Sequence, residues 1–481
     1  MTLVAGVDCS TQATKVVVVE SDDGRLIASA KRPNMVSRHG PSSETDPESW
    51  WQVLAETIRD TGYAGEICAI SIAAQQLGLV TLDAEHRPVR PAILWDDTRS
   101  AEAAAALRRE LGGPEGWARL VGTQPLAGLT ACSWAWLRGA EPESARRTAF
   151  IRLPHDFLTE RLTGNGVTDR GDASGTGWWS SRRETYAPEV LALPQIVLDE
   201  AVLPRVLAQD SAAGQVLASA AVHTGLRTGI PVACGTGDNM AAALALAVEP
   251  GAPVISLGTS GTAYMRSPTP PADASGQVFA DASASGDHLP LTCTLNATLA
   301  VDNLARMLGV SRDDVAPSTR VVVMPYLSGE RLPNYPLARG TVAGIDHATT
   351  AGEMLLAAYE GVAFSLIESL EVLAAHSAGI DADAPIVLVG GGARGRIWQS
   401  TVARLSGRGL LIPECDDLVA WGAAAQAAAL LTNERPVDVA RRWNIRRGSH
   451  VDAVARDAEA IERIRRVRAA ADRMNSEALF A

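Results

Sequence analysis

The sequence has few of the features that mark secreted, metal-binding or nucleic-acid-binding proteins. Its six cysteines lie far apart and form no Cys-x-x-Cys pair, so neither a disulfide framework nor a zinc site is indicated. The formal net charge is -12, and acidic and basic residues are interspersed rather than clustered. A nucleic-acid surface needs clustered Lys and Arg. We therefore expect a protein of the reducing cytoplasm with no nucleic-acid partner.

Signals for membranes and targeting are also absent. The N-terminus has no basic segment followed by an apolar one. The apolar run "AWGAAAQAAALL" (residues 420–431) is bounded by Asp416, Asp417 and Glu434 and is too short to span a bilayer. We interpret it as a packed helix and expect no membrane partner.

The chain is long and apolar enough to bury a large core. It has 481 residues, of which 47% are hydrophobic and 20% are charged. This length exceeds what one ordinary core supports and predicts two or three domains.

Two stretches repeat one plan of strand, small polar turn and strand. The first opens an antiparallel meander over residues 3–33, and the second is "APVISLGTSGTAYMRS" (252–267). Laid without gaps, Asp8 to Thr14 stands over Ser256 to Thr262, an offset of 256 − 8 = 248 that is close to half the chain. A duplicated domain would give this offset. The alternative is that Ser, Thr and Gly are simply common in hairpin turns.

Strands and helices alternate after each of these hairpins. Helical patterns cover residues 49–63 and 99–113, and strand-like runs cover 67–75 and 92–95. In the second half a helix over 349–379 opens with Thr350 and Glu353 as a capping box. A strand (384–390), a glycine loop and a helix (396–407) follow it. The segment "AVEPGAPV" around Glu249 is the best candidate for a domain junction.

Three small-residue turns offer backbone amides that suit phosphate groups. Two are the hairpin turns, Ser10-Thr11-Gln12 and Gly258-Thr259-Ser260-Gly261, and the third is the loop "VGGGARG" (389–395) between a strand and a helix. Two hairpin turns that face each other would hold a polyphosphate from both sides. A tight packing turn is the alternative for the glycine loop.

Two aspartates stand where phosphoryl transfer needs a carboxylate. Asp8 lies within the first turn and suits Mg²⁺ held through water, or a turn-stabilising hydrogen bond as the alternative. Asp238 follows the strand and turn "VACGTG" and precedes an alanine-rich helix. It is either an N-cap or a general base that accepts a hydroxyl proton.

Two further polar segments follow strands. Gln75 and Gln76 interrupt the apolar run "SIAAQQLGLV", and a buried amide needs hydrogen-bond partners. Trp95 is followed by Asp96 and Asp97, a combination that suits a sugar, although we expect Asp97 or Thr98 to cap the next helix. The "LSGERLPNYP" stretch (327–336) is an interdomain strap, a lid or an ordinary surface loop.

Together these segments resemble the FGGY carbohydrate kinases, and within them the xylulokinases. The matching pieces occur in the family's order and cover nearly the whole chain: "GVDCSTQATK", "AAQQLG", "RPAILWDDTR", "GTGDN", "SLGTSGTAY", "PYLSGERLP" and "LVGGGARGRIWQ". The resemblance implies an α/β fold of two actin-like, ribonuclease-H-like domains related by duplication, with a ligand cleft between them. Residues 1–247 would bind the sugar and carry the base, and residues 248–481 would bind ATP.

The resemblance also implies the roles of individual residues. Asp238 corresponds to the catalytic base, which accepts the proton as the γ-phosphoryl group of ATP moves to a terminal hydroxyl of a ketose, with Mg²⁺ held near Asp8. The sugar side would comprise Gln75, Gln76, Leu77, Trp95, Asp238 and Asn239. The ATP side would comprise Ser10, Thr11, Gln12, Gly258, Thr259, Ser260, Gly391, Gly392 and Ala393.

One departure from the family pattern bears on the substrate. Leu77 stands where xylulokinases usually have a sugar-binding histidine. D-xylulose, converted to D-xylulose 5-phosphate, is the family default, and ribulose, erythrulose or a pentitol is the alternative. A more distant alternative is a non-catalytic actin-like sugar sensor. The oligomeric state is left open, with a homodimer among the possibilities.

Overall fold

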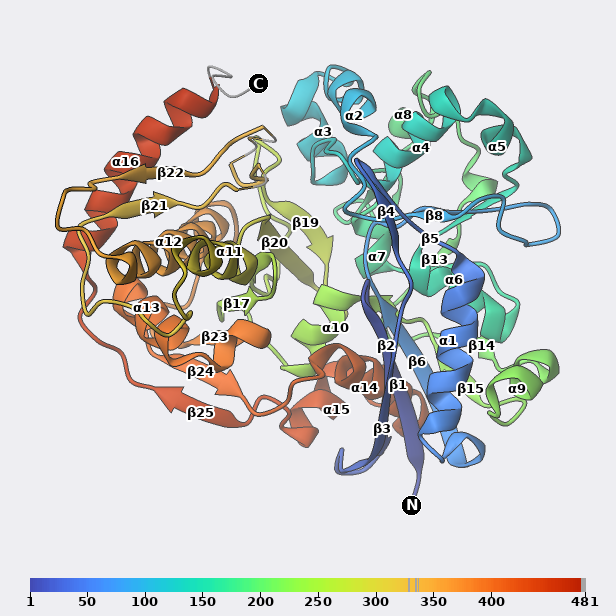
Figure 1. Cartoon of the computed structure of the whole chain (residues 1–481). Helices are drawn as coiled ribbons and strands as arrows, with labels where there is room; N and C mark the ends of the chain where they lie inside the picture. The colour runs from blue at the N-terminus through green and yellow to red at the C-terminus, as the bar shows by residue number, and fades with distance from the viewer. Residues whose placement is uncertain (328, 334, 336, 477–481) are drawn as a thin grey trace. The chain divides into compact units, whose positions relative to one another are not determined.

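The computed structural model describes residues 1–327, 329–333, 335 and 337–476 (Figure 1). The chain forms two compact units. Unit 1 consists of Met1–Val248, Pro268–Leu289 and Asp417–Ile445, and unit 2 of Glu249–Ser267, Pro290–Asp416 and the segment from Arg446 onward. Each unit is thus assembled from separate stretches of chain, whereas our predicted domains were the continuous ranges 1–247 and 248–481. Those ranges stay a prediction.

Unit 1 is built on a mixed seven-stranded sheet. Its main strands run in the order β14-β15-β6-β1-β2-β3, with β16 also paired to β6. The strands are β1 (Leu3–Cys9), β2 (Ala13–Glu20), β3 (Leu26–Pro33), β6 (Ile67–Ala74), β14 (Ala212–Gln215), β15 (Pro231–Ala233) and β16 (Thr236–Gly237). β1 is antiparallel to β2 and parallel to β6. The predicted meander over residues 3–33 is therefore present.

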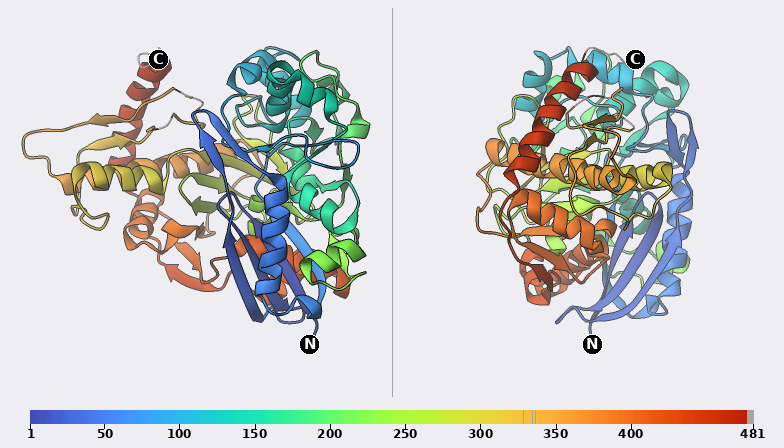
Figure 2. Two further views of the ribbon diagram at one scale, coloured as in Figure 1. Left: turned by 45° about the vertical axis from the view of Figure 1, so that its right-hand side comes forward. Right: turned by 60° about the vertical axis from the view of Figure 1, so that its left-hand side comes forward.

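The two faces of this sheet are covered by different helices. Alternate residues of β1, such as Val7, join a buried apolar cluster with Trp50 and Leu54 of α1 (Pro47–Asp60). Gly6, on the opposite face, lies against Ala420 and Ala424 of α14 (Leu418–Thr432). Figure 2 shows α1 lying along the β1–β3 ribbon. The run predicted to be a packed helix is α14, and it belongs to unit 1.

Smaller elements complete unit 1. Its short sheets pair β4 (Ser37–His39), β5 (Ser42–Thr45) and β8 (Ala92–Ile93), then β7 (Val80–Leu82) with β9 (Phe150–Arg152), β10 (Val167–Asp169) with β13 (Arg205–Leu207), and β11 (Trp179–Ser180) with β12 (Thr185–Tyr186). Its other helices are α2 (Ala101–Arg108), α3 (Gly113–Val121), α4 (Thr130–Ala140), α5 (Pro142–Arg147), α6 (Pro154–Thr163), α7 (Arg170–Ser174), α8 (Pro188–Leu191), α9 (Ala218–Thr224), α10 (Asp238–Ala245) and α15 (Pro436–Trp443).

Unit 2 contains a second sheet with strands in the order β20-β18-β17-β23-β24-β25. The strands are β17 (Val254–Leu257), β18 (Gly261–Tyr264), β20 (His288–Thr294), β23 (Ile386–Val389), β24 (Leu410–Pro413) and β25 (Gly448–Val451), with β21 (Val322–Met324) and β22 (Thr341–Ala343) paired separately. The helices are α11 (Thr298–Leu308), α12 (Ala351–His376), α13 (Arg396–Ser406) and α16 (Ala458–Ser476). The predicted capping box of α12 is confirmed, because Thr350 and Glu353 bond reciprocally.

The two sheets share one topology. Read from β3 to β14 and from β20 to β25, successive pairs are antiparallel, antiparallel, parallel, parallel and antiparallel in both. The hairpins also correspond. The first strand ends at Cys9 in unit 1 and at Leu257 in unit 2, and the second strand begins at Ala13 and at Gly261, so the offset is 257 − 9 = 261 − 13 = 248 in both cases. This correspondence supports the duplication inferred from the sequence. In the part of the chain that the structure describes, no helix has both the length and the apolar character needed to cross a membrane.

Candidate active site

The first predicted phosphate turn connects β1 and β2 in unit 1. The Ser10 hydroxyl and backbone N–H both donate to the carbonyl of Ala13, which fixes the tight turn. Thr11 is half-buried and Gln12 is exposed. The turn therefore presents small polar groups at the carboxyl end of β1.

A hydrogen-bond chain joins this turn to two predicted sugar-binding residues. The Trp95 Nε1 donates to Thr11 Oγ1 at 3.0 Å, and the Thr11 hydroxyl donates to Gln75 Oε1 at 2.9 Å. Gln75 is buried, and its Nε2 has no hydrogen-bond partner among the described residues. An unpaired buried amide is costly, so this donor suits a polar ligand.

A second chain of hydrogen bonds joins Gln76 to Asp238. Asn239 Nδ2 donates to Gln76 Oε1 and to Asp238 Oδ1, both at 2.9 Å. The position of Gly237 permits this approach, because a Cβ there would stand 2.6 Å from Gln76 Cγ. Both glutamines thus belong to polar networks with residues predicted to bind ligand.

Asp238 is the first residue of α10 and is half-buried. The N-cap position belongs to Gly237, so Asp238 is not the N-cap that the local sequence offered as an alternative. Burial, together with the nearby carboxylate of Asp8, raises the pKa of Asp238 to about 7. Within the described residues its Oδ2 receives no hydrogen bond, whereas Oδ1 accepts from Asn239. A carboxylate with one free oxygen and a pKa near neutrality is suited to accept a proton.

Leu77 adopts a left-handed backbone conformation, with φ of 68°. This region is unfavourable for a leucine and is more readily adopted by Asn or His. Its carbonyl accepts a hydrogen bond from Thr130 Oγ1 at 2.9 Å, and its Cδ2 would stand 3.0 Å from a Cβ placed on Gly175. The half-buried side chain is therefore held at a defined position next to Gln76.

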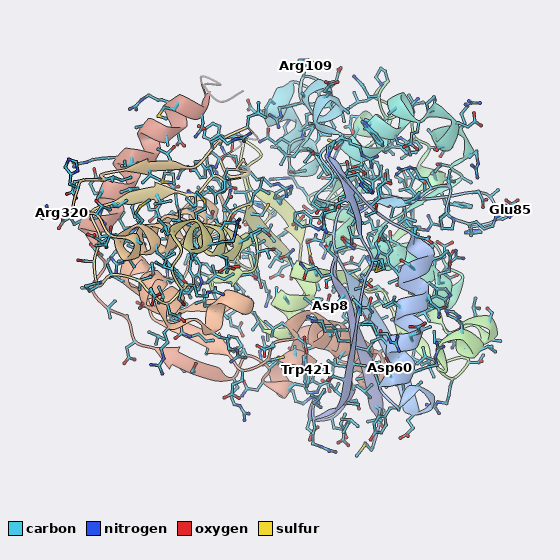
Figure 3. All side chains as sticks on the ribbon, viewed as in Figure 1. Asp8, Asp60, Glu85, Arg109, Arg320 and Trp421 are labelled. Carbon is cyan, nitrogen blue, oxygen red and sulfur yellow. The ribbon has the colours of Figure 1, made fainter. Side chains whose placement is uncertain are left out.

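Asp8 lies inside unit 1 at the end of β1, whereas Glu85 projects from the rim of the unit (Figure 3). Burial raises the pKa of Asp8 to about 6, and Lys15, whose Nζ lies 3.4 Å from Asp8 Oδ2, opposes this rise. Lys15 also contacts Asp417 at 3.2 Å. Asp8 Oδ1 is buried without a hydrogen-bond partner among the described residues.

Unit 2 contains the other two predicted phosphate loops, and they lie side by side. Gly258–Ser260 connects β17 and β18, and Gly391–Ala393 belongs to a 3₁₀ turn (Gly391–Arg394) after β23. Thr298, at the start of α11, donates through its hydroxyl to the Gly258 carbonyl at 2.8 Å. A Cβ on Gly392 would stand 2.8 Å from Thr298 Cγ2 and 2.9 Å from Leu257 Cβ. Glycine at 392 is therefore required for this close packing.

One sequence prediction outside the candidate site is wrong, and one of the three alternatives for a second segment is excluded. Neither Asp97 nor Thr98 caps α2, because the N-cap is Ser100; Asp97 is buried and accepts from the Ser43 N–H at 2.9 Å. Within "LSGERLPNYP", Ser328, Asn334 and Pro336 lie outside the described residues. Glu330 is not part of an ordinary surface loop, since it is buried and accepts from Leu295 N and Asn296 Nδ2.

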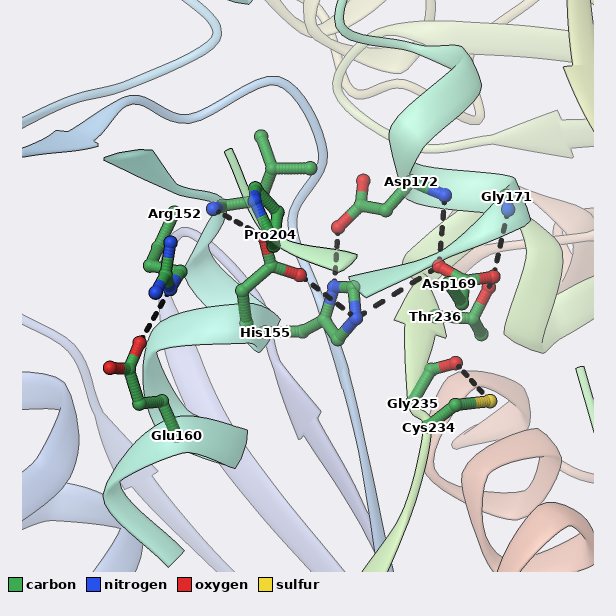
Figure 4. Close-up of polar contacts among 12 residues, drawn as sticks. Arg152, His155, Glu160, Asp169, Gly171, Asp172, Pro204, Cys234, Gly235 and Thr236 are labelled. Atoms are coloured by element: carbon green, nitrogen blue, oxygen red, sulfur yellow. Dashed lines mark hydrogen bonds and ion pairs between the residues drawn. The ribbon is translucent and has the colours of Figure 1, made fainter. Parts of the chain in front are cut away.

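The sequence reasoning missed a buried cluster of charged residues in unit 1. His155 Nδ1 lies 2.6 Å from Asp172 Oδ2, and its Nε2 lies 3.2 Å from Asp156 Oδ1 and 3.9 Å from Asp169 Oδ1 (Figure 4). Asp281 is also buried there and accepts weakly from Ser174. The only signal in the sequence was a set of charged and imidazole side chains among small or apolar residues in "LPHDFL" and "TDRGDASG".

The state of Asp281 predicts a pH-dependent stability. Burial, reinforced by Asp172, raises the pKa of Asp281 from 3.8 to about 8. The folded chain therefore retains a proton that the unfolded chain releases above about pH 4, and this contribution to stability is lost as pH rises toward about 8. Asn mimics the protonated form. We expect Asp281→Asn to gain stability over the wild type by about 1 kcal/mol per pH unit across this window, measured by urea unfolding.

The exposed Asp210→Asn substitution in the same unit provides the control, because it removes the same charge from a side chain that lies in solvent. A stability difference for Asp281→Asn that does not change with pH would contradict a protonated Asp281.

Comparison with known proteins identifies the family. The N-terminal domain of the "FGGY family of carbohydrate kinases" matches residues 3–245, and the C-terminal domain of the same family matches residues 254–431. The chain belongs to the FGGY family of carbohydrate kinases. This FGGY kinase has the two-domain α/β fold of its family, as the resemblance predicted.

Several xylulose kinases are similar to this FGGY kinase. The xylulose kinase of Streptomyces coelicolor is 52% identical over 463 residues, covering 96% of this chain and 95% of the relative. That of Streptomyces rubiginosus is 51% identical with the same coverage. The crystal structure of the xylulose kinase from Bifidobacterium adolescentis superposes with a TM-score of 0.83 at 32% identity, covering 97% of this chain and 99% of that one.

Proposed function

We propose that this FGGY kinase transfers the γ-phosphoryl group of ATP to a terminal hydroxyl of a small ketose, with Asp238 as the general base. The geometry of Asp238 carries the proposal: a half-buried carboxylate that Asn239 orients through Oδ1, whose Oδ2 accepts no hydrogen bond from any described residue, and whose pKa is raised to about 7. Such a group accepts the hydroxyl proton as the sugar oxygen attacks phosphorus. Gln75 and Gln76 would bind the sugar, together with Trp95, Leu77 and Asn239.

The phosphate turns form the second part of the proposal. Ser10–Gln12 in unit 1 and Gly258–Ser260 in unit 2 would bind phosphate groups of ATP through backbone amides and hydroxyls, and Gly391–Ala393 would bind the adenosine part. The small size of these residues and the adjacent packing of the two unit 2 loops support this assignment.

Asp8 fits a role in holding Mg²⁺. Its buried, unpaired Oδ1 is a suitable oxygen ligand, and no group of three or more metal-ligating side chains converges in the described part of the chain. Mg²⁺ commonly binds through one or two carboxylates plus substrate phosphates and water, which matches a site with a single aspartate. When bound, the ion would neutralise charge on the transferring phosphoryl group.

D-xylulose is the substrate we propose first, because relatives named xylulose kinase are 52% and 51% identical over nearly the whole chain. A kinase for ribulose, erythrulose or a pentitol is the second candidate, supported by Leu77. A cytoplasmic location, the absence of nucleic-acid and membrane partners and a homodimeric state stay predictions from the sequence.

A panel of these sugars tests the choice of substrate. We expect kcat/KM for D-xylulose to exceed that for each of the others by about tenfold or more in an assay of ADP release. If another sugar has the highest kcat/KM, it replaces D-xylulose as the proposed substrate. If no sugar stimulates ADP release, the sensor alternative is favoured.

The substitution Leu77→His tests whether residue 77 faces the sugar. A histidine at this position adds a hydrogen-bond donor, so we expect KM for D-xylulose to fall about fivefold while KM for ATP is unchanged. Leu77→Asn is the matched control, because asparagine tolerates the left-handed backbone equally well but has a shorter side chain. An equal fall in KM for both variants would attribute the effect to backbone relief rather than to a sugar contact.

A further inference from the structure

The short helix α7 contacts both parts of the proposed sugar site. At its start, the N-cap Asp169 accepts a hydrogen bond from Thr236 Oγ1 at 2.8 Å, and Thr236 lies two residues before Asp238. At its end, Gly175 lies against the other part of the site, since a Cβ there would stand 3.0 Å from Leu77 Cδ2 and 3.5 Å from Gln76 Nε2. A displacement of α7 would therefore shift both the base and the sugar-binding residues.

A buried imidazolium holds α7 in place. Burial opposes the positive charge of His155, but Asp156, Asp172 and Asp169 outweigh it and raise its pKa to about 9. The ring hydrogen-bonds Asp172 on α7 (Figure 4). The side chains of His155 and the three aspartates are all fully buried. Asp172 would otherwise be a buried negative charge without a cation, which is costly. This cluster of His155, Asp156, Asp169 and Asp172 is thus a rigid platform beneath the site.

The platform contacts the segment that leads to the base at two successive residues. A Cβ on Gly235 would stand 2.7 Å from His155 Cδ2, so the backbone between β15 and β16 lies against the ring. The next residue, Thr236, is fully buried and makes the hydrogen bond to Asp169 Oδ2, which also accepts from the Gly171 N–H. Because Thr236 is fully buried and its hydroxyl is bonded to Asp169, the hydroxyl has no access to a substrate.

We propose that Thr236 is a positioning residue for phosphoryl transfer: its hydrogen bond to Asp169 fixes the Gly237-Asp238 backbone and thereby the direction of the base. The inference rests on the proposed function of Asp238. A catalytic carboxylate must be held in the productive direction. A shift of about 1 Å lowers the rate of the catalysed step by the order of 100-fold.

The test compares Thr236→Val, which keeps the shape and removes the hydroxyl, with Thr236→Ser, which keeps the hydroxyl. We expect Thr236→Val to lower kcat about 10- to 100-fold with KM for ATP unchanged, and Thr236→Ser to retain kcat within about threefold of the wild type. Thr57→Val is the control, because it removes another fully buried threonine hydroxyl, bonded to the Val53 carbonyl within α1 of the same unit. It should leave kcat unchanged.

The outcomes separate this inference from the base assignment. Wild-type kcat in Thr236→Val, alongside an inactive Asp238→Asn, would overturn the positioning role and leave the base in place. Activity in Asp238→Asn would instead overturn the base. If Thr236→Val does not fold, Thr236→Ala replaces it, because the smaller side chain cannot clash. The same loss of kcat is then expected, and circular dichroism measures the folded fraction.

Discussion

Replacing Asp238 with asparagine is expected to lower kcat by about 100- to 10,000-fold while KM for ATP changes little. Asparagine has nearly the same shape and retains the Oδ1 acceptor for Asn239, but its amide cannot take up the sugar proton. The free Oδ2 of the wild type becomes an NH₂ group. A coupled assay of ADP formation measures the loss of turnover, and direct titration with ATP measures binding.

The pH dependence of the wild type provides an independent check. Asp238 acts as a base only when ionised, and burial raises its pKa to about 7. We therefore expect kcat to fall as pH decreases below about 7 and to reach a plateau above it. Asp210→Asn serves again as the exposed control. Near wild-type turnover in Asp238→Asn would refute the assignment of the base.

Replacing Gly422 with alanine is expected to destabilise unit 1 by about 3 kcal/mol or more. Gly422 lies on α14 where the helix crosses α10, and a Cβ there would stand 1.9 Å from the carbonyl oxygen of Ala241. No rotamer relieves a clash of a Cβ with backbone, so the two helices would have to move apart. Because α10 begins with Asp238, turnover of the folded fraction should fall as well. Urea unfolding measures the change in stability.

Gly139→Ala is the matched control for this substitution. Gly139 lies in α4 of the same unit, and a Cβ there would meet nothing within 4 Å. Alanine favours a helix over glycine by about 1 kcal/mol, so this variant should be as stable as the wild type or slightly more stable. Equal stability of Gly422→Ala and the wild type would contradict the close packing of α14 on α10.

The sequence predicted those parts of the fold that depend on residues close together in the chain. The two hairpins, the capping box of α12 and the strand–loop–helix around Gly391 all depend on residues within a few positions of one another. The packing of α14 into unit 1 does not depend on residues that are close together in the sequence. The alanine-rich run predicts a packed helix, but nothing within it indicates that Gly422 meets Ala241 from a distant part of the chain.

The candidate site shows the same division. Gln75, Gln76 and Asp238 stood out because polar residues interrupt apolar or glycine-rich stretches. The burial of His155, Asp169 and Asp172 could not be predicted, because it depends on interactions that join α6 to α7. A charged residue taken by itself is expected to be exposed. Likewise, "GERLP" suggested a loop, and the burial of Glu330 depends on Asn296, 330 − 296 = 34 residues away.

The discontinuity of unit 1 has a consequence for how the protein is made. β1 leaves the ribosome long before α14, which covers one of its faces and is synthesised 424 − 6 = 418 residues later if measured from Gly6 to Ala424. Multidomain chains commonly fold from the N-terminus during synthesis. Here the part of unit 1 that contains β1 must wait, with the α14-facing side of its central sheet uncovered, until α14 has been synthesised.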